Sequence, residues 1–206
     1  MQAMEELYNY LRQNILSGCK DKRFFESLEN RMKDIDLRTR PLMTEVYAQH
    51  LFINDLFDFD VWIDIDYILR SLEYIPNLQI TERTPSYMSN AGIIDINDPV
   101  ILQNRQNVID AKKCHRIYTH KNDFIIIAQI PFFTLGGGDG FRIIDGNHRF
   151  CEAMDNDTPL KAVIILAPYL LPFFCGDSHE LFELLDECAV KIGHNRLFVD
   201  YDLPSL

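Results

Sequence analysis

The chain is short of positive charge, of spaced cysteine pairs and of long apolar runs, and each shortage excludes a class of protein. Its 206 residues include 20 Lys and Arg against 31 Asp and Glu, which gives a formal net charge of −11. Duplex-DNA binding depends on clustered basic residues that release counterions, so we expect no duplex-DNA partner. The five cysteines are odd in number, and no pair has the spacing of zinc ligands. The sequence therefore predicts neither a disulfide framework nor a resident metal.

No apolar run reaches the ~20 residues that a membrane-spanning helix needs. The most apolar stretch, Leu160 to Cys175, is interrupted by Lys161 and Pro168. The N-terminal segment carries Glu5 and Glu6 in place of the basic residues that open a secretory signal. We therefore expect a cytoplasmic protein with free thiols and no membrane partner.

The composition leaves ample apolar material for a packed core, because 47% of the residues are hydrophobic and 12% are aromatic. The length allows one domain, or one domain with a sizeable appendage. Apolar residues recur at helical spacing through residues 1–57, where Pro41 is placed to start a third helix from Leu42 to Phe57. We predict a helical appendage at residues 1–57 and an α/β domain at residues 58–206. The apolar stripes of the appendage are core faces in one interpretation and a groove for a protein partner in the other.

Strand signals gather after residue 58 and favour an α/β, or α+β, fold with a mixed sheet and packed helices. Apolar residues alternate with acidic ones from Phe59 to Ile68, which is the period of a strand. The acidic face, which includes Asp64, is interpreted either as a Mg²⁺ site or as a solvated sheet edge. Asp123 to Ile130 and Phe141 to Ile144 are further strands, and the glycine tract between them, Gly136 to Gly140, predicts a hairpin.

The most informative feature is a polar turn, Asp145-Gly146-Asn147-His148-Arg149, between a predicted strand and a predicted helix. The first N–H groups of a helix lack partners and the helix dipole favours negative charge there, so this arrangement predicts an anion site. Arg149 adds a planar fork of donors that suits phosphate or carboxylate. His148 adds a donor whose charge changes near neutral pH. The alternative interpretation is a tight turn whose polar residues cap the helix.

The turn and its flanking segments resemble the signature of the ParB/sulfiredoxin-like superfamily, in which a strand, a Gly-x-[His/Arg]-Arg type turn and a helix follow one another. The close match runs from Phe141 to Leu166, with a looser one from Trp62 onward. The resemblance implies that superfamily's mixed sheet, and it implies that the turn binds the phosphates of a nucleotide (ATP, ADP or CTP) together with Mg²⁺. The residues that it assigns to the phosphates are Gly146, Asn147, His148 and Arg149.

Two departures from the superfamily narrow the implied reaction. A sulfiredoxin-like reductase carries a cysteine directly before its His-Arg pair, where this chain has Asn147. A chromosome-partitioning ParB has Glu-Arg in the turn and a DNA-binding region after it. The Asp-Gly-x-His-Arg form is similar to the turn of the superfamily's free serine kinases, which implies a phosphotransferase or a nucleotide hydrolase. Such a kinase needs a carboxylate that takes a proton from the acceptor. The candidate catalytic residues are Glu82, Asp64 and Asp145, with Asp145 chiefly orienting the turn.

Two other functions stay open on the sequence. The acidic composition and N-terminal helices are also typical of a non-enzymatic interaction or regulatory protein, which binds a partner or mimics nucleic acid. The turn is also similar to the Asp/Glu-Gly-Asn-Gly-Arg loop of Fic-type AMP transferases. This chain lacks the upstream His-Pro-Phe of that family and has a predicted strand where the Fic loop lies between helices. The sequence is compatible with a homodimer but does not fix the oligomeric state.

Overall fold

A computed structural model of the chain describes residues 2–37, 41, 46–53, 57–114, 122–131 and 140–203. Within these residues the protein is a mixed α+β structure, in agreement with the fold class expected from the sequence. The chain divides into two compact units. The first unit comprises Met1–Pro76, Pro131–Asp139 and Ala167–Leu206, and the second comprises Asn77–Ile130 and Gly140–Leu166.

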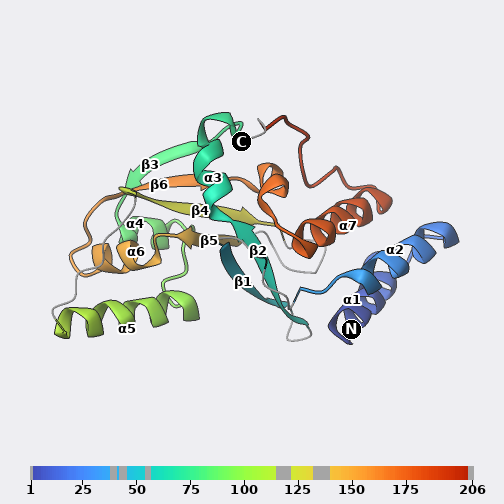
Figure 1. Ribbon diagram of the computed structural model, residues 1–206, viewed down its shortest axis with the longest axis horizontal. Helices are drawn as coiled ribbons and strands as arrows, with labels where there is room; N and C mark the ends of the chain where they lie inside the picture. Colours follow the sequence, from blue (N-terminus) through green and yellow to red (C-terminus); the bar gives the residue numbers. More distant parts are fainter. Residues whose placement is uncertain are drawn as a thin grey trace. The chain divides into compact units, whose positions relative to one another are not determined.

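A four-stranded sheet with the strand order β3-β6-β4-β5 forms the centre of the second unit (Figure 1). Its strands are β3 (Gln79–Arg83), β4 (Phe124–Ile130), β5 (Gly140–Asp145) and β6 (Leu160–Ile165). β4 and β6 run parallel, whereas β3 pairs with β6, and β5 with β4, in antiparallel fashion. Because β4 and β6 begin where β3 and β5 end, one edge of the sheet collects residues from all four strands. We call it the turn edge.

Three helices cover one face of this sheet: α4 (Pro85–Asn90), α5 (Pro99–Lys113) and α6 (Asn147–Met154). Thr84 and Asp98 cap α4 and α5, and each of these two helices has proline in its first turn, where the missing N–H costs nothing. The buried core between helices and sheet is contiguous. Its members include Met88, Ile101, Val108, Ile125, Ile127, Ile143, Phe150, Cys151, Ala162 and Ile164.

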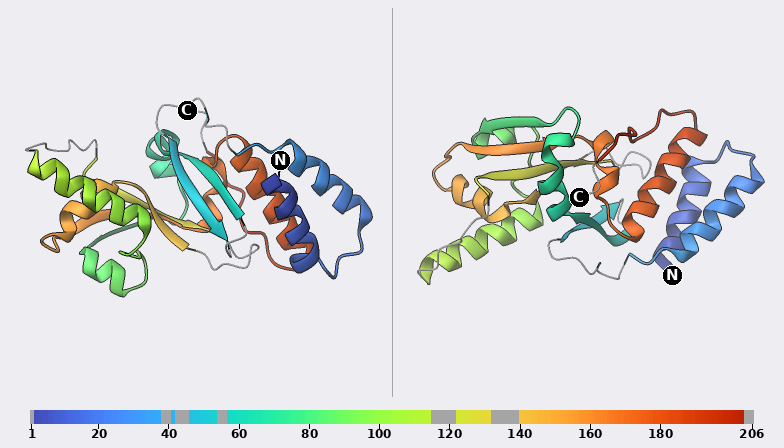
Figure 2. Two further views of the ribbon diagram at one scale, coloured as in Figure 1. Left: turned by 90° about the horizontal axis from the view of Figure 1, so that it is seen from below. Right: turned by 45° about the horizontal axis from the view of Figure 1, so that its top comes forward.

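The first unit contains three longer helices, which Figure 2 shows side by side: α1 (Gln2–Tyr10), α2 (Lys22–Asp34) and α7 (Asp177–Lys191). A π-helical turn, η1 (Leu11–Ile15), continues α1, and Asp21 caps α2 by accepting a hydrogen bond from the Phe24 N–H. Arg31 of α2 bridges to α7 through Glu180 (2.6 Å) and Glu187 (2.7 Å). The leucines and methionines whose helical spacing predicted α1 and α2 are buried in this unit.

The remaining elements of the first unit are a hairpin and short helices. They are β1 (Val46–Ile53), β2 (Phe57–Asp64), α3 (Ile65–Ser71), η2 (Leu72–Tyr74), η4 (Ala167–Tyr169) and η5 (Leu171–Phe173). Among the helices in the described ranges, none is long and apolar enough to cross a bilayer.

The third helix predicted from Leu42 to Phe57 is wrong. Residues Val46–Ile53 form β1, which pairs with β2 from Val46 opposite Asp64 to Ile53 opposite Phe57. The segment is rich in aromatic and β-branched residues, and its apolar spacing fits both periods. The antiparallel partner β2, which is the next element along the chain, favours the strand over the helix. Because β1 lies within the appendage predicted at residues 1–57, that appendage is not entirely helical. The predicted domain boundary at residue 57 stays a prediction.

The hairpin predicted around the glycine tract is confirmed in its two strands. β4 and β5 pair antiparallel from Ile130 opposite Gly140 to Ile126 opposite Asp145. Gly136 to Asp139 lie outside the described residues. The strand predicted from Phe59 is also present as β2, but it ends at Asp64, where α3 begins.

Candidate functional site

The polar turn joins β5 to α6, as the sequence predicts, and a glycine sets its path. Gly146 has φ +88°, in the left-handed region, and it precedes the first residue of α6. A Cβ at this position would lie 2.7 Å from Cγ2 of Ile125 and 3.2 Å from its Cα. The backbone of the turn is therefore packed directly against β4, which only glycine allows.

A β-bulge lies immediately before the turn. Asp145 pairs with Ile126 and Ile143 pairs with Ile127, so Ile144 is an extra residue in β5. Bulges redirect the side chains that follow them and are common beside functional sites. Here the bulge and the left-handed glycine together fix the direction in which α6 leaves the sheet.

No side-chain cap is present on the first turn of α6 among the described residues, because the N-cap residue is Gly146. The Asn147 side-chain amide donates to the Ile143 carbonyl at 3.3 Å, while its Oδ1 is buried without a hydrogen-bond partner among the described residues. His148 follows, half-buried, in the same turn. A helix start without a side-chain cap leaves donors for an external anion.

Arg149 is the most unusual side chain of the turn. It is half-buried, and its Nε and Nη1 atoms are buried without a hydrogen-bond partner in the part of the chain that the structure describes. Burial lowers the pKa of Arg149, while the carboxylates of Asp145, Asp123 and Glu152 act in the opposite direction. Buried guanidinium donors normally have partners, which makes these two nitrogens unusual among the described residues.

The register of the sheet brings Glu82 to the same turn edge. Glu82 lies opposite Lys161, and Lys161 lies beside Phe124 at the start of β4. Lys161 donates from Nζ to Oδ2 of Asp123 at 2.8 Å, an ion pair that lowers the pKa of Asp123 and raises that of Lys161. Of the predicted catalytic residues, Glu82 and Asp145 therefore lie at the same end of one sheet, but on its two outer strands, β3 and β5, with β6 and β4 between them.

Asp64, the remaining predicted catalytic residue, belongs to the first unit. It is buried at the end of β2, where its Oδ1 accepts a hydrogen bond from the Tyr67 N–H at 2.8 Å and caps α3. This local bond accounts for a carboxylate at position 64 by helix capping alone.

Sequence reasoning missed Asp123 and Lys161, which add charge to the turn edge. The available signals were a carboxylate immediately before a strong apolar strand and a lysine as the second residue of another. Neither signal indicates that the two strands run parallel and start side by side. Among the residues that the structure describes, no three His, Cys, Asp or Glu side chains are grouped as metal ligands would be.

Cys151 lies on α6 directly after the turn, and its thiol is not poised to act as a nucleophile. The side chain is fully buried, and its Sγ contacts the Ile101 carbonyl at 3.6 Å. Burial raises the pKa of the Cys151 thiol to about 11. The thiolate is the reactive form, so this cysteine is protected at neutral pH.

We expect iodoacetamide to label Cys114 well before Cys151 in the folded protein at pH 8. With a pKa of about 11, roughly 1 in 1,000 Cys151 thiols is ionised at that pH, and burial also keeps the reagent from the sulfur. Cys114 is exposed at the end of α5. Peptide mapping by mass spectrometry after timed labelling measures both rates, and equal rates for the two cysteines contradict the expectation.

Comparison of the chain with protein-family models, with curated proteins and with solved structures finds no match. Support for a function therefore comes from the residues of the turn edge themselves.

Proposed function

We propose that the turn from Asp145 to Arg149 binds the phosphates of a nucleotide, and that the protein is a ParB/sulfiredoxin-like phosphotransferase or nucleotide hydrolase. The observation that carries this proposal is the pair of buried Arg149 nitrogens at the start of α6, which have no hydrogen-bond partner among the residues that the structure describes. A phosphate oxygen supplies acceptors for that fork and also suits the positive end of a helix.

Each residue of the turn has a distinct part in this proposal. Gly146 gives the turn the left-handed backbone from which α6 starts, and His148 adds a side-chain donor beside the first N–H groups of the helix. Asn147 contributes its backbone N–H, because its side-chain amide donates to the Ile143 carbonyl. Asp145 orients the turn. Phosphoryl transfer relies mainly on positioning and on neutralising charge, so a small set of donors is sufficient.

Glu82 is our first candidate for the base that takes a proton from the acceptor hydroxyl or water. Its support is its place at the turn edge, opposite Lys161 on the neighbouring strand. Asp64 stays a weaker candidate, because its carboxylate already caps α3. Mg²⁺ commonly binds through one or two carboxylates and the substrate's phosphates. We therefore expect Mg²⁺ to arrive with the nucleotide and to be shared with acidic residues of the turn edge.

Titration of the full chain with ATP, ADP, CTP and GTP, with and without Mg²⁺, tests the proposal. We expect at least one nucleotide to bind in calorimetry and to raise the melting temperature. Arg149→Ala removes a charged hydrogen-bond donor and should weaken that binding by about 10- to 100-fold. Arg149→Lys keeps the charge but loses the fork, so its affinity should lie between the two.

Arg105→Gln is the matched control, because Arg105 is an exposed arginine on α5 of the same unit and is not part of the turn. It should bind like the wild type. Absence of binding by every nucleotide, with the wild-type protein folded, refutes the proposal and favours the non-enzymatic interaction protein. Equal losses in Arg149→Ala and Arg105→Gln would show that general charge, and not the turn, holds the ligand.

A further inference from the structure

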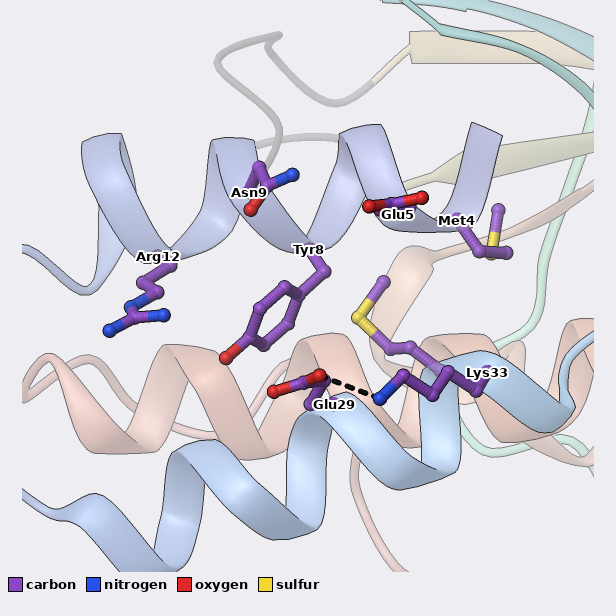
Figure 3. Close-up of a pocket in the computed structure, with 8 residues that line it drawn as sticks. Met4, Glu5, Tyr8, Asn9, Arg12, Glu29 and Lys33 are labelled. Atoms are coloured by element: carbon purple, nitrogen blue, oxygen red, sulfur yellow. Dashed lines mark hydrogen bonds and ion pairs between the residues drawn. The ribbon is translucent and has the colours of Figure 1, made fainter. Parts of the chain in front are cut away.

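A groove between α1–η1 and α2, within the first unit, has the size and lining of a ligand site (Figure 3). Its volume is about 590 Å³, inside the range of ~300–1,000 Å³ that is usual for small-ligand pockets. Eight side chains line it, namely Met4, Glu5, Tyr8, Asn9, Arg12, Glu29, Met32 and Lys33. The turn edge belongs to the other unit, so this groove is a separate feature.

The floor of the groove is apolar and adaptable. Met4, Tyr8 and Met32 are 6%, 7% and 2% exposed, respectively. Methionine is unbranched and polarisable, and it adjusts to ligand side chains of different shape. The floor can therefore accept apolar ligand side chains of different shapes.

Two charges on the α2 side of the groove neutralise each other. Lys33 donates from Nζ to Oε1 of Glu29 at 2.6 Å, four residues apart on the same helix (Figure 3). This pair lowers the pKa of Glu29 and raises that of Lys33. The α2 wall thus offers little net charge to a ligand.

The α1–η1 wall carries three polar groups, of which Glu5 acts electrostatically on Lys33, and Arg12 on Glu29, across the groove. Glu5, Asn9 and Arg12 are spaced by four and three positions and so share one helix face. The Arg12 guanidinium lies over the Phe25 ring, 5.5 Å from its centroid, a contact that leaves its N–H donors available. Along the groove the order is a carboxylate, an amide and a guanidinium.

The helix is irregular where it supplies Arg12. Residues Leu11–Ile15 form the π-helical turn η1, in which the Leu16 N–H donates to the Leu11 carbonyl at 2.7 Å. Single π-turns within α-helices are rare, and they occur frequently at functional sites. This is a second observation, independent of the groove's volume, that points to a ligand here.

We propose that the groove binds a short peptide with free termini and an apolar side chain. The ammonium group of the peptide pairs with Glu5, and its carboxylate pairs with Arg12. A central amide of the peptide contacts Asn9, and the apolar side chain lies on Met4 and Met32. Seven helical positions separate Glu5 from Arg12, which is about 10 Å at 1.5 Å per residue. An extended tripeptide spans about the same distance at 3.4 Å per residue. The groove accordingly selects a tripeptide over a free amino acid.

Calorimetric titration of the full chain with the tripeptide Ala-Leu-Ala tests this proposal. We expect saturable 1:1 binding, and binding about tenfold weaker or worse when the same peptide is N-acetylated and C-amidated. Glu5→Gln and Arg12→Gln should each weaken binding of the free peptide by about tenfold. The blocked peptide has no charged terminus to pair with Glu5 or Arg12. Neither variant should therefore bind the blocked peptide more weakly than the wild type does.

Glu6→Gln is the matched control for Glu5→Gln, since it makes the same change on the adjacent residue, which does not line the groove. Arg23→Gln, exposed on α2, serves in the same way for Arg12→Gln. Circular dichroism establishes that every variant is folded. The proposal is overturned if the free peptide gives no saturable heat, if blocked and free peptides bind equally, or if the control variants lose as much affinity as the groove variants.

Discussion

Replacing Gly146 with alanine is expected to lower the free energy of unfolding by about 3 kcal/mol. A left-handed backbone costs an L-residue roughly 1–2 kcal/mol, and forcing an extra methyl into a packed site costs about 1–3 kcal/mol. Both apply at this glycine, whose φ is +88° and whose added Cβ would lie 2.7 Å from Ile125. Guanidinium unfolding followed by circular dichroism measures the change. The same variant should also weaken nucleotide binding, because the backbone of the turn must shift.

Gly92→Ala separates the two causes. Gly92 lies in the same unit with φ +70°, but a Cβ added to it would have no atom within 4 Å beyond its chain neighbours. This control should therefore lose only the roughly 1–2 kcal/mol of backbone strain. If Gly146→Ala and Gly92→Ala destabilise the protein equally, the contact with Ile125 contributes nothing and the close packing of the turn on β4 is wrong.

Phe182→Ala in α7 is expected to destabilise the protein by about 3–5 kcal/mol, the usual cost of emptying a fully buried aromatic site. The Phe182 ring stacks on Phe174 with centroids 3.9 Å apart and an interplanar angle of 5°, and it meets the edge of Phe198 at 6.2 Å. All three rings are buried. Loss of the central ring removes both aromatic contacts and leaves a cavity. Chemical unfolding at constant pH gives the value.

Two companion variants make this result interpretable. Phe182→Leu retains much of the volume and should cost clearly less than Phe182→Ala. Val190→Ala changes a half-exposed residue of the same helix and should stay within about 0.5 kcal/mol of the wild type. A loss below about 1 kcal/mol for Phe182→Ala would contradict the dense packing of this aromatic cluster.

The parts of the fold that the sequence predicted well have strong local signals. The run from Phe124 to Ile130 is almost entirely apolar, and the segment from Gly140 to Asp145 is followed by Gly146, whose left-handed backbone ends the strand. The candidate phosphate residues follow one another in the chain, so their proximity required no knowledge of the tertiary structure. The helix predicted after the turn is present as α6, which begins at Asn147, within the turn itself.

The missed features depend on pairing between distant segments. The pair formed by Lys161 and Asp123 spans 38 positions, and it exists because β4 and β6 are parallel neighbours. The same topology places Glu82 opposite Lys161. β1 was mistaken for a helix because its apolar residues fit either period, and only its antiparallel partner β2 resolves the ambiguity. The spacing of residues along the sequence does not indicate which distant strands pair with each other.

The order of the segments along the chain also determines when each unit can close during synthesis. Every residue of the second unit has been translated once Leu166 is added, whereas the first unit still lacks α7. Arg31 precedes its partner Glu180 by 149 positions. At about 5–20 residues per second, α1 and α2 wait roughly 7–30 seconds on the ribosome before α7 can cover them. Helices α1 and α2 are thus made well before the helix that packs beside them, which leaves their apolar faces accessible to chaperones throughout that interval.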